Sequence, residues 1–147
     1  MEDSEKNPNI INEPTVAYGN IGNYDIFNII ESIRNGIHFQ KFMNILKQSP
    51  FSLSEWSYFL HISDRTMQRY QKEDKTFDQL QSEKIFEIVL IYRMGVQVFG
   101  SSDAFNIWLH TKNMVLGNVN PKDLMDSSFG ISLIKDELHR IEHGIFA

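Results

Sequence analysis

The segment at residues 62–72, ISDRTMQRYQK, carries side chains of the types that bind DNA. Arg65 and Arg69 are spaced one helical turn apart and follow Ser63, a residue type that caps helices. Arginine hydrogen-bonds guanine edges, the side chain of Thr66 can contact a base or a thymine methyl group, and basic residues neutralise phosphates. We therefore predict a recognition helix whose DNA contacts come from Ser63, Arg65, Thr66, Gln68, Arg69, Lys72 and Lys75.

The charge of this segment favours a second interpretation. Between Asp64 and Lys75, four basic residues stand against three acidic ones, and the whole chain has a net charge of −5. A surface that binds the phosphates of DNA is normally more basic than that. The alternative to DNA binding is therefore a protein-binding module in which this charged helix face is simply solvated.

His139, Glu142 and His143 form an HxxEH pattern, which in inverted zinc peptidases supplies two zinc ligands and a glutamate base. A catalytic zinc also needs a third protein ligand and a sheltered pocket, and only four residues follow His143. Two surface histidines near a helix end, where cations are favoured, explain the pattern better. The sequence has no Gly-rich phosphate loop and no Ser/His/Asp order, so we expect neither an enzyme nor a bound cofactor.

The elements that must position these residues are helices. Apolar residues recur at intervals of three and four, and no alternating strand pattern of convincing length occurs. Capping residues, glycines and prolines separate the periodic runs, with Ser82 as the expected cap of the longest helix. The sequence predicts an all-α fold, with helices over residues 24–35, 39–46, 52–60, 64–72, 82–99 and 131–143 and shorter helical segments from residues 102 and 120.

Residues 52–71 fit the pattern of a helix-turn-helix, in which two short helices share a small core across a tight turn. Small Ser57 falls where the helices must approach closely. His61 occupies a turn position that often takes glycine because its φ is positive, and histidine tolerates this less easily, so we expect a looser turn. The apolar residues predicted to form the shared core are Trp56, Leu60, Ile62, Met67 and Tyr70.

Composition bounds the class of protein. A chain of 147 residues with 41% hydrophobic residues can form one ordinary domain or two small ones, and it has no cysteine for disulfides or thiolate chemistry. It shows no membrane-spanning stretch and no secretion signal, so we expect no membrane partner and a cytoplasmic location. We predict a flexible arm over residues 1–22, a helix-turn-helix domain over 23–78 and a second helical domain over 79–147, whose core includes Trp108, Leu124 and Ile141.

The chain ends in an apolar tail that follows a helix-ending glycine. Little chain remains to cover this tail, so we expect it to fill the cleft of a partner protein. The basic residues just before it are placed to meet acidic or phosphate-binding surroundings, although a solvated helix face explains them equally well. The residues expected at the partner are Lys135, Arg140, His143, Gly144, Ile145, Phe146 and Ala147.

Two long stretches carry further motifs in a fixed order. Residues 61–89 contain an "IS-RT" recognition helix, a polar link and a Ser-acidic-basic helix start, and residues 98–147 contain FG, A-x-x-W-L, N-x-x-L-G, P-x-x-L, G and L-x-R-I-x-x-G. In these motifs the chain resembles the Xre/MbcA/ParS family of antitoxins, the partners of RES-domain toxins, from about residue 36 to the carboxyl end. Two departures occur: Tyr70 replaces a commonly basic residue, and residues 111–113 replace a frequent Pro-Asn pair.

The resemblance implies an antitoxin of a type II toxin–antitoxin system. The N-terminal half would be a Cro-like helix-turn-helix domain that binds operator DNA and represses its own operon, usually as a homodimer within a toxin–antitoxin complex. The C-terminal half would bind a RES-domain toxin, which acts on NAD, and would cover the NAD cleft sterically without chemistry of its own. The family's N-x-x-L-G element adds Asn113 and Leu116 to the expected toxin-binding residues.

Overall fold

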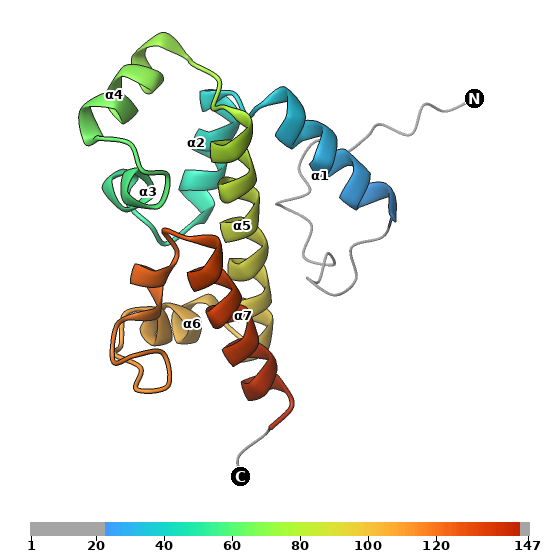
Figure 1. Cartoon of the computed structure of the whole chain (residues 1–147), viewed down its shortest axis with the longest axis vertical. Coiled ribbons are helices and arrows are strands. Elements are labelled where there is room, and N and C mark those ends of the chain that lie inside the picture. Colours follow the sequence, from blue (N-terminus) through green and yellow to red (C-terminus); the bar gives the residue numbers. More distant parts are fainter. Residues whose placement is uncertain (1–22, 145–147) are drawn as a thin grey trace.

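The computed structural model describes residues 23–144 of the chain, and these residues confirm the predicted all-α fold. Within this part, β structure is limited to two isolated bridges. The predicted arm over residues 1–22 and the tail residues Ile145, Phe146 and Ala147 lie outside the described residues. The helices are α1 (Asn23–Asn35), α2 (Phe39–Gln48), α3 (Leu53–Phe59), α4 (Asp64–Glu73), α5 (Gln79–Phe99), α6 (Ser102–Leu109), the 3-10 helix η3 (Pro121–Leu124) and α7 (Ser128–Glu142) (Figure 1).

Short polar side chains start most of these helices. Ser52 caps α3 by accepting a hydrogen bond from the main-chain N–H of Glu55 at 3.1 Å, and the Glu55 carboxylate accepts one from the N–H of Ser52 at 3.1 Å. Asp78 and Gln81 form the same reciprocal arrangement at the start of α5. Each such pair satisfies two N–H groups that have no partner within the helix itself.

The prediction that Ser82 caps α5 is wrong, because Asp78 holds that position and Ser82 lies one turn inside the helix. Ser82 is fully buried, and its hydroxyl accepts a hydrogen bond from the N–H of Ile37 at 3.0 Å and donates one to the carbonyl of Phe77 at 3.3 Å. Its role is therefore to join α5 to the connection between α1 and α2.

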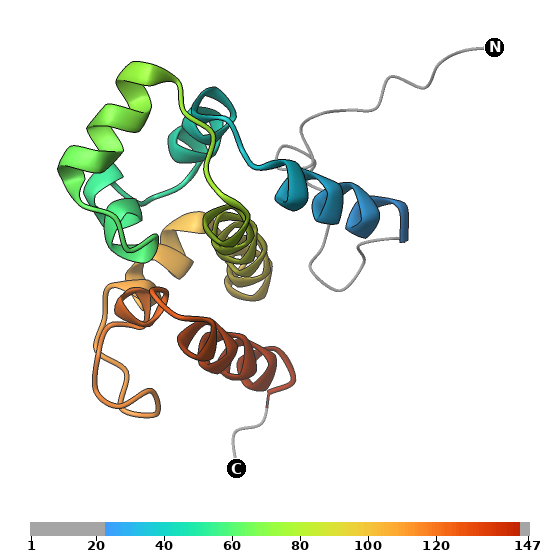
Figure 2. The same cartoon turned by 45° about the horizontal axis from the view of Figure 1, so that its top comes forward.

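The long helix α5 joins the two halves of the molecule. Figures 1 and 2 show α2, α3 and α4 beside its N-terminal half and α6 and α7 beside its C-terminal half. Helix α6 comes very close at Gly95, where a Cβ atom would overlap the ring of Phe105. A larger residue at Gly95 would push α6 away from α5.

One hydrophobic core runs through both halves, and a chain of aromatic contacts marks its course. Phe42 of α2 meets Trp56 of α3 edge to face, with 5.3 Å between ring centroids. Phe51 contacts both Trp56 and Tyr92 of α5, and Tyr92 contacts Phe105 of α6 at 5.7 Å. Because aromatic pairs of this kind add about 0.5–1.5 kcal/mol each beyond their burial, the two halves are packed together and not merely linked.

Most of the predicted core residues are confirmed. Trp56, Leu60 and Met67 are buried, and Ile62, Tyr70, Trp108 and Leu124 are half-buried and pack against the core. Ile141 is also only half-buried, because it lies near the C-terminal end of α7, where few elements remain to cover it.

Within residues 23–144, no single helix is long and apolar enough to cross a bilayer. Helices α5 and α6 reach the required length and composition only together, and they meet at a bend of 112°.

Candidate functional site

The turn between α3 and α4 is tight, and the expectation of a looser turn is wrong. His61 adopts a left-handed conformation with φ of 57°, and the N–H of Ile62 donates to the carbonyl of Ser57 at 3.1 Å. The imidazole Nε2 of His61 also lies 2.6 Å from the main-chain carbonyl oxygen of Asp126. This distant hydrogen bond offsets the cost of about 1–2 kcal/mol that a left-handed conformation imposes on a residue other than glycine.

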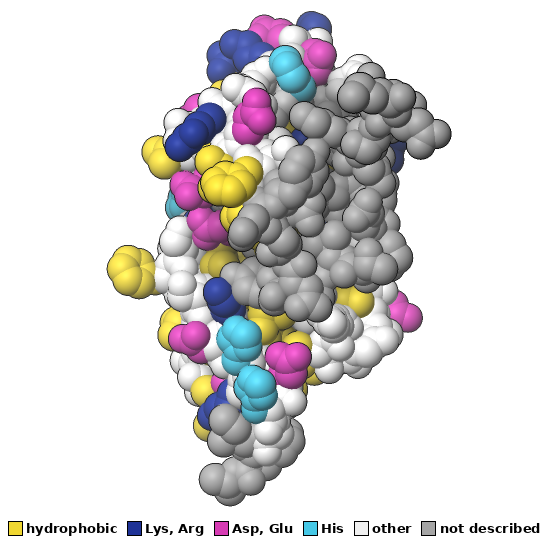
Figure 3. Space-filling model, turned by 90° about the vertical axis from the view of Figure 1, so that its right-hand side faces the viewer, with side chains coloured by type: hydrophobic (Ala, Val, Ile, Leu, Met, Phe, Trp, Pro, Cys, Tyr) yellow, Lys and Arg dark blue, Asp and Glu magenta, His cyan; other side chains and the backbone are white. Residues whose placement is uncertain are grey.

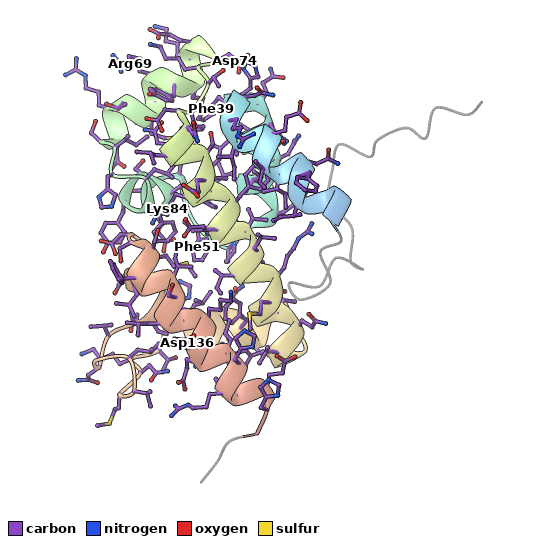
Figure 4. The ribbon with its side chains drawn as sticks, turned by 45° about the vertical axis from the view of Figure 1, so that its right-hand side comes forward. Phe39, Phe51, Arg69, Asp74, Lys84 and Asp136 are labelled. Carbon is purple, nitrogen blue, oxygen red and sulfur yellow. The ribbon has the colours of Figure 1, made fainter. Side chains whose placement is uncertain are left out.

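Arg65, Gln68, Arg69 and Lys72 share one solvent-exposed face of α4, because their spacing of three and four residues follows the helical repeat. Met67 is buried on the opposite side. Figure 4 shows Arg69 projecting from the outer side of α4. Within residues 23–144 no ion pair engages the three cations of this face, so they are available to an anionic partner. We call these four residues the α4 face.

Two other predicted DNA contacts lie at the start of α4. The hydroxyl of Ser63 accepts a hydrogen bond from the N–H of Thr66 at 3.0 Å and donates one to Oγ1 of Thr66 at 2.9 Å. These hydroxyl groups therefore first serve the helix cap, and a DNA contact by either residue stays a prediction.

Lys75 lies beyond the end of α4, which Asp74 terminates with φ of 49°. Its ammonium group is 3.4 Å from the Glu73 carboxylate and lies over the Tyr70 ring. The structure thus separates Lys75 from the α4 face. It also cancels one basic charge of the segment against one acidic charge.

Tyr70 points inward from α4. It is half-buried, and its ring centroid lies 5.3 Å from that of Phe77. A tyrosine at this position therefore removes no charge from the outward face, which keeps both arginines and Lys72.

Three polar contacts fasten the helix-turn-helix to the segment around η3. The hydroxyl of Tyr58 donates to the carbonyl of Asp123 at 2.9 Å, and Lys122 lies 3.0 Å from the Glu55 carboxylate. The third contact is the hydrogen bond from His61 described above. All three connect α3 or its following turn to residues more than sixty positions later in the chain, so the two halves are held in a fixed relation.

The carboxyl group of Glu55 is tuned by this contact. Burial alone would raise its pKa, but hydrogen bonds from the Ser52 N–H and from Lys122, together with the positive charge of Lys122, lower the pKa below its ordinary value. The pKa of Tyr58 is raised by burial and by the negative charges of Asp126 and Asp123. Glu55 is therefore a carboxylate and Tyr58 a neutral donor at neutral pH, as these contacts require.

The outward face of α7 carries two apolar residues that sequence reasoning missed. Phe129 is 89% exposed and Leu133, one turn later, is 50% exposed. Arg140 and His143, both predicted at the partner, continue the same face, which we call the α7 face. Lys135 is half-buried to one side of it. In an amphipathic helix an apolar residue normally signals the core, and only the structure shows that these two point outward.

The loop between α6 and η3 contains the predicted residues Asn113 and Leu116. Oδ1 of Asn113 accepts hydrogen bonds from the N–H groups of Val115 at 2.9 Å and Leu116 at 3.3 Å, and its main chain pairs with Val119. Leu116 is only 8% exposed. Both residues shape the loop, so a direct toxin contact by either stays a prediction. The exposed apolar side chains here, also missed from sequence, are Met114, Val115 and Val119.

Two family models match the chain. Residues 29–89 match the antitoxin Xre-like helix-turn-helix domain, and residues 94–144 match the antitoxin Xre/MbcA/ParS C-terminal toxin-binding domain. The chain is also similar to the "Antitoxin Xre" of Yersinia enterocolitica serotype O:8 / biotype 1B (strain NCTC 13174 / 8081), with 26% identity over 120 residues that cover 81% of each chain. The first matched region contains the α4 face, and the second contains the α7 face up to Gly144.

Proposed function

Because the chain belongs to the Xre-type antitoxins, we propose that its C-terminal half sterically blocks a RES-domain toxin that consumes NAD, and that its N-terminal half binds operator DNA and represses its own operon. Family membership establishes the antitoxin class, the two domain types and a non-enzymatic role. Our proposal adds three points to this: that the toxin is a RES-domain protein, that it consumes NAD, and that the chain represses its own operon. We also expect a homodimer within the toxin–antitoxin complex, in the cytoplasm.

The observation that carries the proposal is that one packed chain presents two separate surfaces suited to different partners. The α4 face offers Arg65, Arg69 and Lys72 on a helix that follows a tight turn. A helix of this kind enters the major groove, where arginine reads guanine and other cations neutralise phosphates.

The α7 face offers a different chemistry. Phe129 and Leu133 are large, apolar and exposed, and such side chains bury themselves readily against another protein. Inhibition by covering a cleft needs area and fit, and it needs no nucleophile or general base in the antitoxin. The tail that begins after Gly144 would extend this contact into the cleft itself.

A protein-binding module without DNA binding remains the second candidate, because the charges between Asp64 and Lys75 nearly balance. The arrangement of those charges supports DNA binding over this alternative. Lys75 and Glu73 pair with each other, and Asp64 accepts a hydrogen bond from Ser54. Arg65, Arg69 and Lys72 therefore remain on the outward face, while the carboxylates of Glu73 and Asp64 are engaged by other side chains.

Co-expression with the protein encoded beside this chain tests the proposal. We expect the neighbouring protein to be a RES-domain toxin and to co-purify with the full chain. A chain that stops at Gly144 should bind the toxin more weakly and neutralise it less, and it should retain its affinity for DNA from upstream of the gene, which serves as the control for folding. Full neutralisation by the truncated chain would refute the role of the tail. Failure to capture the neighbouring protein would refute the toxin assignment.

A further inference from the structure

We propose that His139, Glu142 and His143, at the C-terminal end of α7, form a binding site for a divalent transition-metal ion such as zinc. Of these three residues the proposed antitoxin function uses only His143, as a side chain of the α7 face, and it gives no role to His139 or Glu142. The proposed site also differs from the catalytic zinc site that the HxxEH pattern first suggested. In such a site the glutamate is a base and a further ligand is required, whereas here Glu142 itself is the third ligand.

The geometry brings three metal-binding groups together. His139 and His143 lie one helical turn apart, with ring planes only 10° from parallel and centroids 6.2 Å apart. The Glu142 carboxylate is 3.9 Å from Nδ1 of His139. One ligand atom from each of the three residues lies within 4.8 Å of the others. Figure 3 shows two histidine side chains beside an acidic side chain at this end of α7.

Only small movements separate this arrangement from a coordinated ion. Zinc binds nitrogen and oxygen at about 2.0–2.2 Å, so two ligands of a tetrahedral zinc ion lie roughly 3.3 Å apart. The ligand atoms must therefore close by about 1.5 Å or less. Glu142 and His143 are exposed and His139 is half-buried, so rotations about side-chain bonds can supply this movement without disturbing the helix backbone.

The donor set selects the class of ion. Two imidazole nitrogens and one carboxylate oxygen suit zinc, nickel and copper, whereas magnesium and calcium require oxygen ligands throughout. The nearest cation on the helix, Arg140, is held by Glu137 at 2.6 Å, which offsets its repulsion of a metal ion. Three protein ligands leave a coordination position for water or for a group on a binding partner.

A bound ion would stabilise the last turn of α7. It would link residues at positions i and i+4, where the helix otherwise has no further turn to support it. Because the ion binds the helical form and not the unfolded chain, it should raise the melting temperature. This gives the site a readout that is independent of toxin and DNA.

The test is titration of the full chain, prepared without a histidine tag, with zinc or nickel under calorimetry. We expect one equivalent of metal per chain, a raised melting temperature, and no binding of magnesium. The variants H139A and H143A should each bind at least about tenfold more weakly, because each loses one of three ligands. The matched control is H110A, which removes an exposed histidine from the end of α6 that is not part of the cluster.

The outcomes that would overturn the proposal are distinct. Equal binding by the parent chain and by H139A or H143A would place the metal elsewhere, and no binding by the parent would remove the site altogether. The variant E142Q tests the third ligand, since it keeps the size of the side chain and removes its charge. If E142Q binds zinc as tightly as the parent, the three-ligand site is wrong. Circular dichroism without metal should show the same helix content in all variants, because the ligand side chains are not buried.

Discussion

The imidazole Nε2 of His61 lies 2.6 Å from the carbonyl oxygen of Asp126, so the turn of the helix-turn-helix is fastened to the segment between η3 and α7. The contact of Tyr58 with Asp123 and the ion pair of Glu55 with Lys122 reinforce the same junction. A toxin that binds the C-terminal half would therefore contact a packed unit that also contains α4. We expect toxin binding and DNA binding to influence each other through this junction.

His61 carries two opposing effects that substitutions can separate. His61→Ala loses the hydrogen bond to Asp126 and keeps the backbone strain of a side chain at positive φ, so we expect a loss of about 0.5–1.5 kcal/mol in the free energy of unfolding. His61→Gly also loses the hydrogen bond but relieves the backbone strain. It should therefore be more stable than the alanine variant by about 1 kcal/mol. Urea unfolding measures both. If the alanine variant were as stable as the glycine variant, the positive φ at residue 61 would not strain the backbone.

The lowered pKa of Glu55 makes the junction sensitive to acid. A group whose pKa is lower in the folded state contributes stability above its unfolded pKa, here the ordinary value of 4.5, and loses it as the pH falls through the folded pKa. We therefore expect the free energy of unfolding to fall as the pH is lowered from 4.5 through the folded-state pKa of Glu55. Lys122→Met should reduce the fall without abolishing it, because the Ser52 N–H still lowers the pKa of Glu55.

The matched control for this pH profile is Lys112→Met, which removes an exposed lysine from the loop after α6. Its profile should follow that of the parent chain. At neutral pH, a double-mutant cycle between Glu55→Gln and Lys122→Met should give a coupling of about 0.5–1 kcal/mol, as is usual for partly exposed pairs. A pH profile that Lys122→Met leaves unchanged would show that this ion pair does not tune Glu55.

The helices could be predicted because the repeat of apolar residues is a local property. The inward positions Trp56, Leu60 and Met67 follow from it directly. The prediction of the start of α5 is wrong because Ser82 and Asp78 are both of residue types that cap helices. The distinguishing signal was present, since only Asp78 is followed three residues later by a residue, Gln81, that can complete a capping box.

The features that could not be predicted depend on contacts between distant segments. The positive φ of His61 is stabilised by Asp126, which lies 65 residues later in the chain, and no local pattern encodes that contact. Similarly, the exposure of Phe129 depends on which side of α7 faces α5. Periodicity gives a helix an apolar stripe, but it does not say whether an extra apolar residue beside that stripe is covered.

Loss of the α4 face should abolish specific DNA binding. Replacing Arg65 and Arg69 by Ala removes two cations without known protein partners in the described region and leaves the buried side of α4 intact, so the fold should survive. If both arginines contact phosphates, the slope of log affinity against log salt should fall by about two, and a guanine contact adds about 1–3 kcal/mol.

Fluorescence anisotropy with DNA from upstream of the gene, at rising salt, measures this effect. Lys112→Ala changes an exposed cation outside the α4 face, so its affinity and salt slope should match those of the parent chain. Unchanged operator affinity in the double arginine variant would refute α4 as the recognition helix and would favour the module without DNA binding.

The α7 face should contribute to toxin affinity. Phe129→Ala and Leu133→Ala remove exposed apolar surface, so each should weaken the complex by about 1–3 kcal/mol while the melting temperature of the free chain stays nearly constant. The control is Phe27→Ala, which truncates an apolar residue, 66% exposed, on α1, outside the region that matches the toxin-binding domain. Calorimetric titration with the toxin measures the affinity of each variant and of the parent chain. Equal toxin affinity for Phe129→Ala, Leu133→Ala and the parent chain would exclude this face from the interface.

The most direct measurement is the rate of NAD consumption by the purified protein encoded beside this chain, which we propose to be the toxin, as the chain is titrated into the assay. We expect NAD consumption to fall in proportion to the added chain and to stop at a fixed ratio, with the Arg65→Ala, Arg69→Ala variant as effective as the parent. Consumption that continues at excess chain, or NAD loss caused by the chain alone, would contradict a non-enzymatic antitoxin that acts by covering the toxin.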